Sequence, residues 1–253
     1  MSNKNENANA EELYKIIESL GYLNNSITFN VVSSGESVFQ DNRYSNVAEV
    51  EAEVNWSKNH QHTAIYHEFC GQMGFITFSE AGLIGGNDVH LKMCFSYAVT
   101  LMESCLCEML KSVTMRYDQF KRNAMSNFNE LSSEKIKVSE LFDKDPKDVI
   151  NSKIIEQLSH ILYHDLRKVK RVYNDILGKD ISTIENDAYK KASELMKMRH
   201  DIVHRNGKKM TGESIDITRD TVDSCIRNIT LFVKGVHNYI NDAIAELNTK
   251  KTD

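Results

Sequence analysis

Arginine and histidine side chains gather in the stretch Met198–Gly207, which reads Met-Arg-His-Asp-Ile-Val-His-Arg-Asn-Gly. A histidine can donate or accept a proton near neutral pH, and the planar guanidinium of an arginine can hold a phosphate through paired hydrogen bonds. Cleavage of RNA without a metal needs both abilities. The 2′-hydroxyl must lose a proton, the pentavalent phosphate must be stabilised, and the leaving 5′-oxygen must gain a proton. Arg199 and His204 are therefore candidate catalytic residues, and His200 is a candidate for positioning a substrate.

The stretch ends a segment, residues 184–206, whose apolar spacing predicts an amphipathic helix. Its apolar arc consists of Ala192, Leu195, Met196, Met198, Ile202 and Val203. Arg199 falls in the middle of that arc, while His200 and His204 lie at its edge one turn apart. Two interpretations are open. Arg199 pairs with a buried acid or caps a neighbouring helix, or this face meets a second subunit and the charged residues line a shared cleft.

The pattern Arg-x4-His, from Arg199 to His204, resembles the signature of the HEPN ribonuclease superfamily. Its position strengthens the resemblance, which covers roughly residues 88–248, because the motif ends a late helix and one long helix follows. In that family a helical bundle dimerises and two motifs face each other. The resemblance implies metal-independent RNA cleavage by Arg199 and His204 in a homodimer, without a cofactor. It also implies a toxin or antiviral effector, with an antitoxin or regulatory protein as a further partner.

Two points limit what the resemblance implies. Some toxin members carry a tyrosine two residues after the histidine, where this chain has Asn206, so regulation through that tyrosine is not implied. The alternative function is a non-catalytic HEPN-like module that binds a nucleotide or a protein partner.

Other polar residues could support RNA binding. Asn206 could contact the phosphate or cap the helix. The densest basic cluster, together with two lysines after the motif, could guide the phosphate backbone or form an ordinary solvated face. These residues are Arg167, Lys168, Lys170, Arg171, Lys208 and Lys209.

Metal binding is the competing chemistry. His160 and His164 have the same one-turn spacing as His200 and His204, but the nearby acids, Asp165 and Asp201, point away from the histidine pairs on predicted helices. The sequence therefore predicts no metal site.

The composition is that of a globular protein, with 41% hydrophobic and 26% charged residues. The net charge of −5 argues against broad electrostatic binding of nucleic acid, so an RNA-binding surface must be a local patch. The odd number of cysteines, five, lacks metal-site spacing. The N-terminus has no signal-peptide pattern and no apolar run reaches membrane-span length, so we expect a cytoplasmic protein that does not bind a membrane.

The expected fold is mainly α, with a C-terminal HEPN-like helical bundle and a small α+β N-terminal module. We place a disordered tail at residues 1–10, the α+β module at 11–86, the bundle at 87–248 and a second tail at 249–253. Within the module, residues 11–20 are predicted to be helical, and the strands are expected at 27–32, 47–56 and 75–78.

The bundle is expected to contain four long amphipathic helices, at residues 89–113, 152–177, 184–206 and 218–247. A less apolar helical connection, residues 116–131, follows the first of them. Residues 132–150 are predicted to be a polar linker anchored by Val138, Leu141 and Phe142, with Pro146 at a helix start.

Overall fold

The structure is a computed structural model that describes residues 47–82, 88–136, 138–142, 144–181 and 186–249. These residues are mostly helical, and within them the only β-structure is an isolated bridge between Lys208 and Ser214. The mainly helical fold is therefore confirmed. The expected tails and the elements predicted at 11–20 and 27–32 lie outside the described residues, apart from Thr249, which ends the last helix.

Two segments predicted to be strands are helices. Residues 47–56 belong to α2 (Val47–Asn59), and residues 75–78 belong to α3 (His62–Gly82). The prediction of a strand at 47–56 followed an alternation of apolar and acidic residues. The residues that α2 buries are Val50, Val54 and Ser57, whose spacing of four and three residues is helical.

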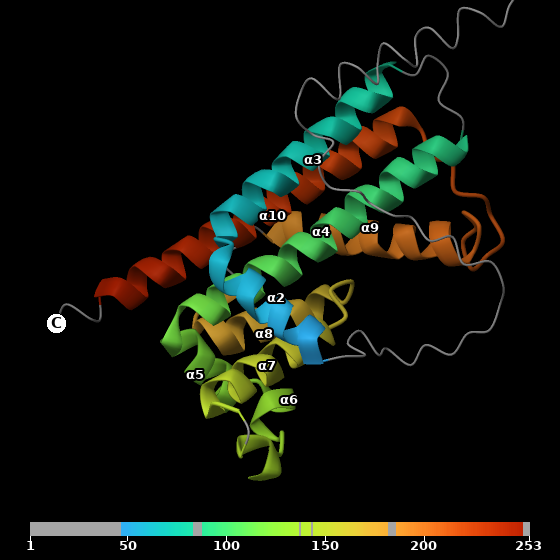
Figure 1. The fold of residues 1–253 in the computed structure, drawn as a ribbon. Coiled ribbons are helices and arrows are strands. Elements are labelled where there is room, and N and C mark those ends of the chain that lie inside the picture. Colours follow the sequence, from blue (N-terminus) through green and yellow to red (C-terminus); the bar gives the residue numbers. More distant parts are fainter. Residues whose placement is uncertain (1–46, 83–87, 137, 143, 182–185, 250–253) are drawn as a thin grey trace, which may run out of the picture. The chain divides into compact units, whose positions relative to one another are not determined.

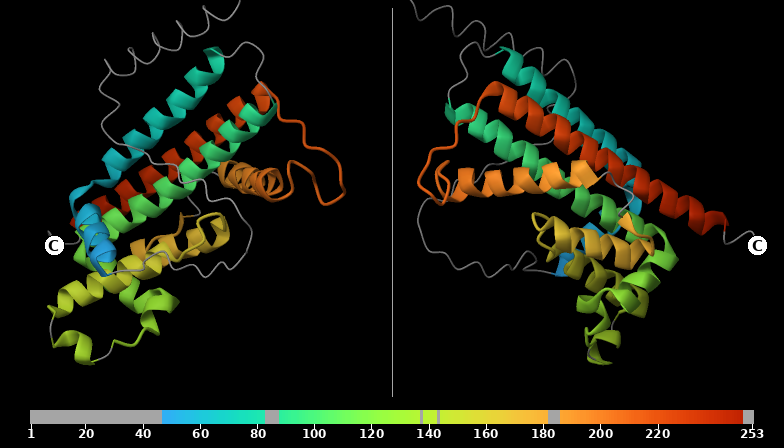
Figure 2. Two further views of the ribbon diagram at one scale, coloured as in Figure 1. Left: turned by 45° about the vertical axis from the view of Figure 1, so that its right-hand side comes forward. Right: turned by 180° about the vertical axis from the view of Figure 1, so that it is seen from behind.

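α4 (Asp88–Arg116) corresponds to the long helix predicted at residues 89–113. It is the central helix of the fold and contacts α2, α3, α9 and α10. The three long helices α3, α4 and α10 (Arg219–Thr249) lie side by side (Figures 1 and 2). The apolar residues of α4 that face these neighbours are almost completely buried, and they include Phe95, Met102, Leu106 and Leu110. α2 and α3 thus share one core with the bundle. The described residues, from Val47 onward, belong to one compact unit, and the predicted boundary near residue 86 falls inside it.

The apolar residues in the first turns of α4 are not all part of the core. Val89, Met93 and Tyr97 are exposed. α4 is also long and apolar enough to cross a membrane by length and composition, but more than half of its apolar stretch is buried inside the protein, as in the core helix of a bundle.

The region after α4 folds into shorter helices than expected. It contains α5 (Asp118–Asn127), α6 (Asn129–Ser132), the 3-10 helix η1 (Val138–Leu141), α7 (Pro146–Ser159) and α8 (Leu166–Leu177). Pro146 begins α7 as predicted, after Asp145, whose side chain accepts a hydrogen bond from the Lys147 amide. The proposed linker anchors are wrong, because Val138, Leu141 and Phe142 are all exposed.

The single long helix predicted at 152–177 is also wrong, because α7 ends at Ser159 and α8 begins at Leu166. Asp165 causes the new start, since its carboxylate accepts hydrogen bonds from the amides of Arg167 and Lys168. The Tyr163 hydroxyl donates to the Leu158 carbonyl and fixes the turn between the helices.

The last two helices agree with the prediction from the sequence. α9 (Asn186–His204) and α10 correspond to the helices predicted at 184–206 and 218–247. α9 packs against both α4 and α10, and it ends near the start of α4 (Figure 2).

Candidate functional site

The candidate site is built on the last turns of α9. Ala192, Met196 and Ile202 are buried in the core of their own chain, and Leu195 and Met198 pack against that core. The expectation that the apolar arc of this helix packs across a subunit interface therefore needs correction. Val203 is the residue of the apolar arc that faces solvent, with 46% of its surface exposed.

Arg199 is half-buried within this otherwise apolar surface. Its Nε atom is buried and donates no hydrogen bond, and it has no ion pair within the described part of the chain. Burying an N–H donor without an acceptor is unfavourable, and mutational data put the effect at roughly 1–3 kcal/mol. Among the described residues Arg199 thus has no buried acid as a partner, and its guanidinium remains able to receive an anion.

His200 and His204 are both exposed on the final turn of α9. Their ring centroids lie 4.8 Å apart, and the ring planes are inclined by 44°. Neither histidine is a packing residue of the core. Both are therefore accessible to a substrate and able to exchange protons with it.

The motif ends in a tight reversal of the chain. The Gly207 amide donates to the Asp201 carbonyl at 3.1 Å, and Asn206 and Gly207 have positive φ angles of 52° and 75°. Gly207 thus closes the end of the helix, and Asn206 is exposed in the reversal. An ion pair of 2.8 Å between Arg205 and Asp201 closes the last turn.

A short hairpin, residues 207–215, follows the motif and was not predicted from the sequence. The Ile215 amide donates to the Gly207 carbonyl at 2.7 Å, and the Lys209 amide donates to the Glu213 carbonyl. Lys208 and Lys209 are exposed on this hairpin, so the structure brings both lysines beside the motif. The glycine at position 212 was the available sequence signal for the turn, since it adopts a positive φ of 84° without strain.

α4 contributes Lys92 to the same end of α9. A Cβ atom at Gly207 would lie 3.0 Å from Lys92 Cε, which shows how closely the lysine side chain crosses the end of the motif. No local sequence pattern marks Lys92, because α4 and α9 are distant in the sequence.

The basic cluster on α8 lies elsewhere. Lys170 Nζ lies 6.0 Å from the ring centroid of Tyr189, near the start of α9. Tyr189 is about 22 Å along the helix axis from His204, given a rise of ~1.5 Å per residue. Arg167 and Lys168 already pair with Asp165 and Glu130, and Arg171 is exposed on the same helix. The structure therefore separates this cluster from the motif.

The second histidine pair does not have the helical geometry that the competing metal hypothesis required. His160 and His164 are exposed in the connection between α7 and α8. Within the described ranges, no group of three or more histidine, cysteine, aspartate or glutamate residues is placed to hold a metal ion.

A histidine cluster between α3 and α10 was missed by the sequence analysis. His62 Nε2 lies 2.8 Å from Asn241 Oδ1, and the Tyr66 and His237 rings stack with centroids 4.2 Å apart. Burial lowers the pKa of both His62 and His237. Burial disfavours the charged form, so the cluster is a neutral packing element rather than an exposed acid–base site.

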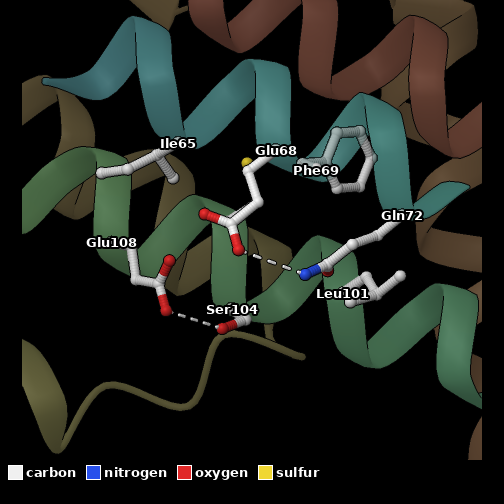
Figure 3. Close-up of a pocket in the computed structure, with 8 residues that line it drawn as sticks. Ile65, Glu68, Phe69, Gln72, Leu101, Ser104 and Glu108 are labelled. Atoms are coloured by element: carbon white, nitrogen blue, oxygen red, sulfur yellow. Dashed lines mark hydrogen bonds between the residues drawn. The ribbon is translucent and has the colours of Figure 1, made fainter. Parts of the chain in front are cut away.

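Two acidic clefts flank α4. The smaller one, of about 90 Å³, places Glu68 of α3 opposite Glu108 (Figure 3). Burial raises the pKa of Glu108, while the hydrogen bond that Ser104 donates to it acts in the opposite direction. The larger cleft, of about 450 Å³, is lined by residues of α2, of α4 and of the α7–α8 connection. Neither cleft is lined by a residue of the Arg-x4-His motif.

The comparisons with known proteins identify the family of the chain. The family model RiboL-PSP-HEPN matches residues 77–242, from the last turns of α3 to the second half of α10. No curated protein and no solved structure matches the chain. The matched region covers most of the chain and contains the whole motif, and the chain therefore belongs to the RiboL-PSP-HEPN family.

Proposed function

We propose that this protein is a metal-independent endoribonuclease whose catalytic residues are Arg199 and His204. One observation carries the proposal: in a chain of this family, a half-buried arginine that has no ion pair among the described residues lies beside two exposed histidines at one helix end. Arginine without a protein anion is suited to a phosphate, and exposed histidine is suited to proton transfer.

The reaction that these groups support is attack by the ribose 2′-hydroxyl on the adjacent phosphate. One histidine accepts the proton of the 2′-hydroxyl, and a new bond forms between the 2′-oxygen and phosphorus. Arg199 stabilises the negative charge of the pentavalent phosphate. A second, protonated histidine gives its proton to the 5′-oxygen as the P–O bond breaks. The products are a 2′,3′-cyclic phosphate and a 5′-hydroxyl.

The need for both an acid and a base supports a homodimeric site. We assign these roles to the His204 side chains of two copies, with His200 and Asn206 positioning the RNA. The exposed apolar strip that Val89, Met93 and Tyr97 form at four-residue spacing on α4 supports such an assembly. Exposed apolar patches of this kind commonly mark interfaces between proteins. Val203, exposed on the motif helix itself, is the fourth candidate for this interface.

The cellular role that we propose is that of a toxin or antiviral effector acting in the cytoplasm, held in check by an antitoxin or regulatory protein. This part of the proposal rests on the family alone. Lys208 and Lys209, on the hairpin beside the motif, are proposed RNA contacts. The α8 cluster, at the far end of α9, is at most a distant guide for a longer RNA.

The test is incubation of the purified full chain with mixed RNA, with and without EDTA, followed by analysis of the RNA ends. We expect cleavage in EDTA, with 2′,3′-cyclic phosphate ends, and at least ~100-fold slower cleavage by His204→Ala. His164→Ala is the matched control, because His164 is also exposed but lies outside the motif. If EDTA abolishes the cleavage and zinc or manganese restores it, the enzyme is metal-dependent and this proposal is wrong. RNA binding without cleavage would instead favour the non-catalytic alternative.

A further inference from the structure

The side chain of Lys92 crosses the end of the candidate site. A Cβ atom at Gly207 would lie 3.0 Å from Lys92 Cε and 3.1 Å from its Nζ, so a residue with a side chain at position 207 would displace the lysine. Glycine is required at this position for a second reason, its φ of 75°. The contact therefore ties the first turns of α4 to the last turn of the motif helix.

The lysine amine lies at the same helix end as the exposed His204. The Gly207 amide donates to the Asp201 carbonyl, so the chain folds back over the last turn of α9. Gly207 therefore lies within roughly one helical turn, about 5 Å of rise, of His204. The side chain of Lys92 is 22% exposed, and its Nζ is 2.6 Å from Asp88 Oδ2 on its own helix. It is therefore partly held in place and partly open to solvent at the same helix end as His204.

Helix capping alone does not account for Lys92. A cation near a helix C-terminus is favourable. This helix end, however, already carries Arg205, Lys208 and Lys209, and Gly207 closes it with a backbone hydrogen bond. A further ammonium among like charges adds repulsion.

The local charge balance points to an anion from outside the chain. Three ion pairs neutralise three of the cations around the helix end: Lys92 with Asp88, Arg205 with Asp201, and Lys209 with Glu213. Arg199 and Lys208 have no ion pair among the residues that the structure describes. The helix end thus carries a surplus of positive charge in a protein whose net charge is −5. Such a local patch is what an acidic protein needs to bind RNA.

We infer that Lys92 is a phosphate-binding residue of this site, which holds an RNA backbone phosphate next to the one held by Arg199. The inference rests on the proposed function. The ammonium group is a compact donor with rotational freedom, so it can leave Asp88 for a phosphate oxygen without the fixed geometry that a guanidinium requires. Gly207 is then needed both to end the helix and to leave room for this lysine.

Binding of a non-cleavable, fully 2′-O-methylated single-stranded RNA tests the inference, measured by fluorescence anisotropy over a series of salt concentrations. Lys92→Met keeps most of the aliphatic chain and removes the charge. We expect about tenfold weaker binding, and the slope of log K against log salt should become shallower by about 0.7, the value for one lost phosphate contact on a single strand. Lys92→Arg should restore most of the affinity and the slope.

Lys121→Met is the matched control. Lys121 has nearly the same side-chain exposure, 21%, and pairs with Asp118 on its own helix, but it belongs to α5. We expect the wild-type slope for this variant. An unchanged slope for Lys92→Met, an equal change for Lys121→Met, or a lowered melting temperature with normal RNA binding would each overturn the role of Lys92.

The binding assay also separates the two proposals. Wild-type protein that binds this RNA but cleaves no natural RNA would end the endoribonuclease proposal. The salt dependence of RNA binding by Lys92→Met would still show whether Lys92 contacts a phosphate. Wild-type protein that cleaves RNA while Lys92→Met binds normally would end only the inference about Lys92. Absence of RNA binding by the wild type would end both.

Discussion

Arg199 and His204 belong to the same motif but lie in different environments. The guanidinium of Arg199 is half-buried and its Nε has no acceptor within the described residues, whereas His204 is exposed on the last turn of α9. A buried, unsatisfied donor lowers stability, while an exposed imidazole has little effect on it. Residues that destabilise the free protein and are kept for function are expected at ligand-binding sites. The two environments therefore predict that replacing Arg199 changes the stability of the fold, whereas replacing His204 hardly does.

Arg199→Met should separate stability from activity. Methionine fills the same half-buried volume without a charge, so the free energy of unfolding should stay the same or rise by about 1 kcal/mol. Cleavage should fall at least ~100-fold, because the phosphate charge loses its partner. Urea unfolding and initial rates measure the two quantities, with Arg171→Met, at an exposed position on α8, as the control. A loss of more than about 2 kcal/mol of stability would show instead that Arg199 holds the fold together.

The buried His62 and the half-buried His237, between α3 and α10, predict a pH-dependent stability. Burial lowers the pKa of His62, and Arg116 acts in the same direction, while the hydrogen bond to Asn241 opposes them. Burial, together with His62 and His67, lowers the pKa of His237. Both groups thus bind protons more weakly in the folded chain than at the ordinary value of 6.5. Stability should therefore fall as the pH drops below about 6.5, until the pH is below the folded-state pKa values.

His62→Gln tests that expectation, because glutamine can keep a hydrogen bond to Asn241 without titrating. Urea unfolding between pH 7.5 and 5 should show a smaller loss of stability in this variant than in the wild type. His164→Gln, at an exposed position, should lose as much stability as the wild type. Equal pH dependence in all three proteins would exclude His62 as a source of the effect.

At the scale of elements, the sequence predicted the helices whose apolar residues follow a long, regular helical spacing. α4, α9 and α10 agree with their predicted ranges within a few residues. The predictions failed where a short pattern was ambiguous. In α2, the alternation of valines and acidic residues matched the pattern of a strand. The segment is helical because that conformation packs its buried valines against α4. Between α7 and α8, the capping carboxylate of Asp165 outweighed an apolar pattern that continued through it.

Two glycines in different elements should respond oppositely to alanine. Gly71 lies in the middle of α3, where a Cβ would meet nothing within 4 Å, so Gly71→Ala should raise the free energy of unfolding by about 0.5–1 kcal/mol. Gly207 has a φ of 75° and a Cβ there would press on Lys92, so Gly207→Ala should lower it by about 1–3 kcal/mol. Urea unfolding measures both. A neutral Gly207→Ala would show that the reversal after α9 can relax around a side chain.

For the whole molecule, the sequence located the motif but not the surface around it. The Arg-x4-His spacing is local, so one helix suffices to predict it. Lys92 reaches the site from α4, and this contact depends on the packing of distant segments, which periodicity does not describe. The same limit explains Met93 and Tyr97: their spacing matches a core stripe, but the end of α4 on which they lie has no neighbour covering them among the described residues. Their exposure moves the expected interface from the apolar arc of α9 to the first turns of α4.

The exposed strip on α4 predicts how the molecule assembles. Met93 is 66% exposed at the centre of the strip, so a charge there should prevent two copies from packing while leaving the folded chain intact. We expect Met93→Glu to be monomeric by light scattering, to keep the wild-type circular dichroism spectrum, and to lose most of its cleavage. Phe75→Glu is the matched control, because Phe75 is 63% exposed on α3 and outside the strip.

Mixing subunits then tests whether the site is shared. The proposed site uses His204 from both copies, whereas a mixed dimer of Arg199→Ala and His204→Ala subunits keeps only one His204, so we expect the mixture to stay inactive. Partial recovery of activity, abolished by adding Met93→Glu to both proteins, would show instead that one arginine and one histidine from different copies suffice. A Met93→Glu monomer with full activity would show that one copy holds a complete site. The acid and the base would then have to be His200 and His204 of the same helix, whose ring centroids are 4.8 Å apart.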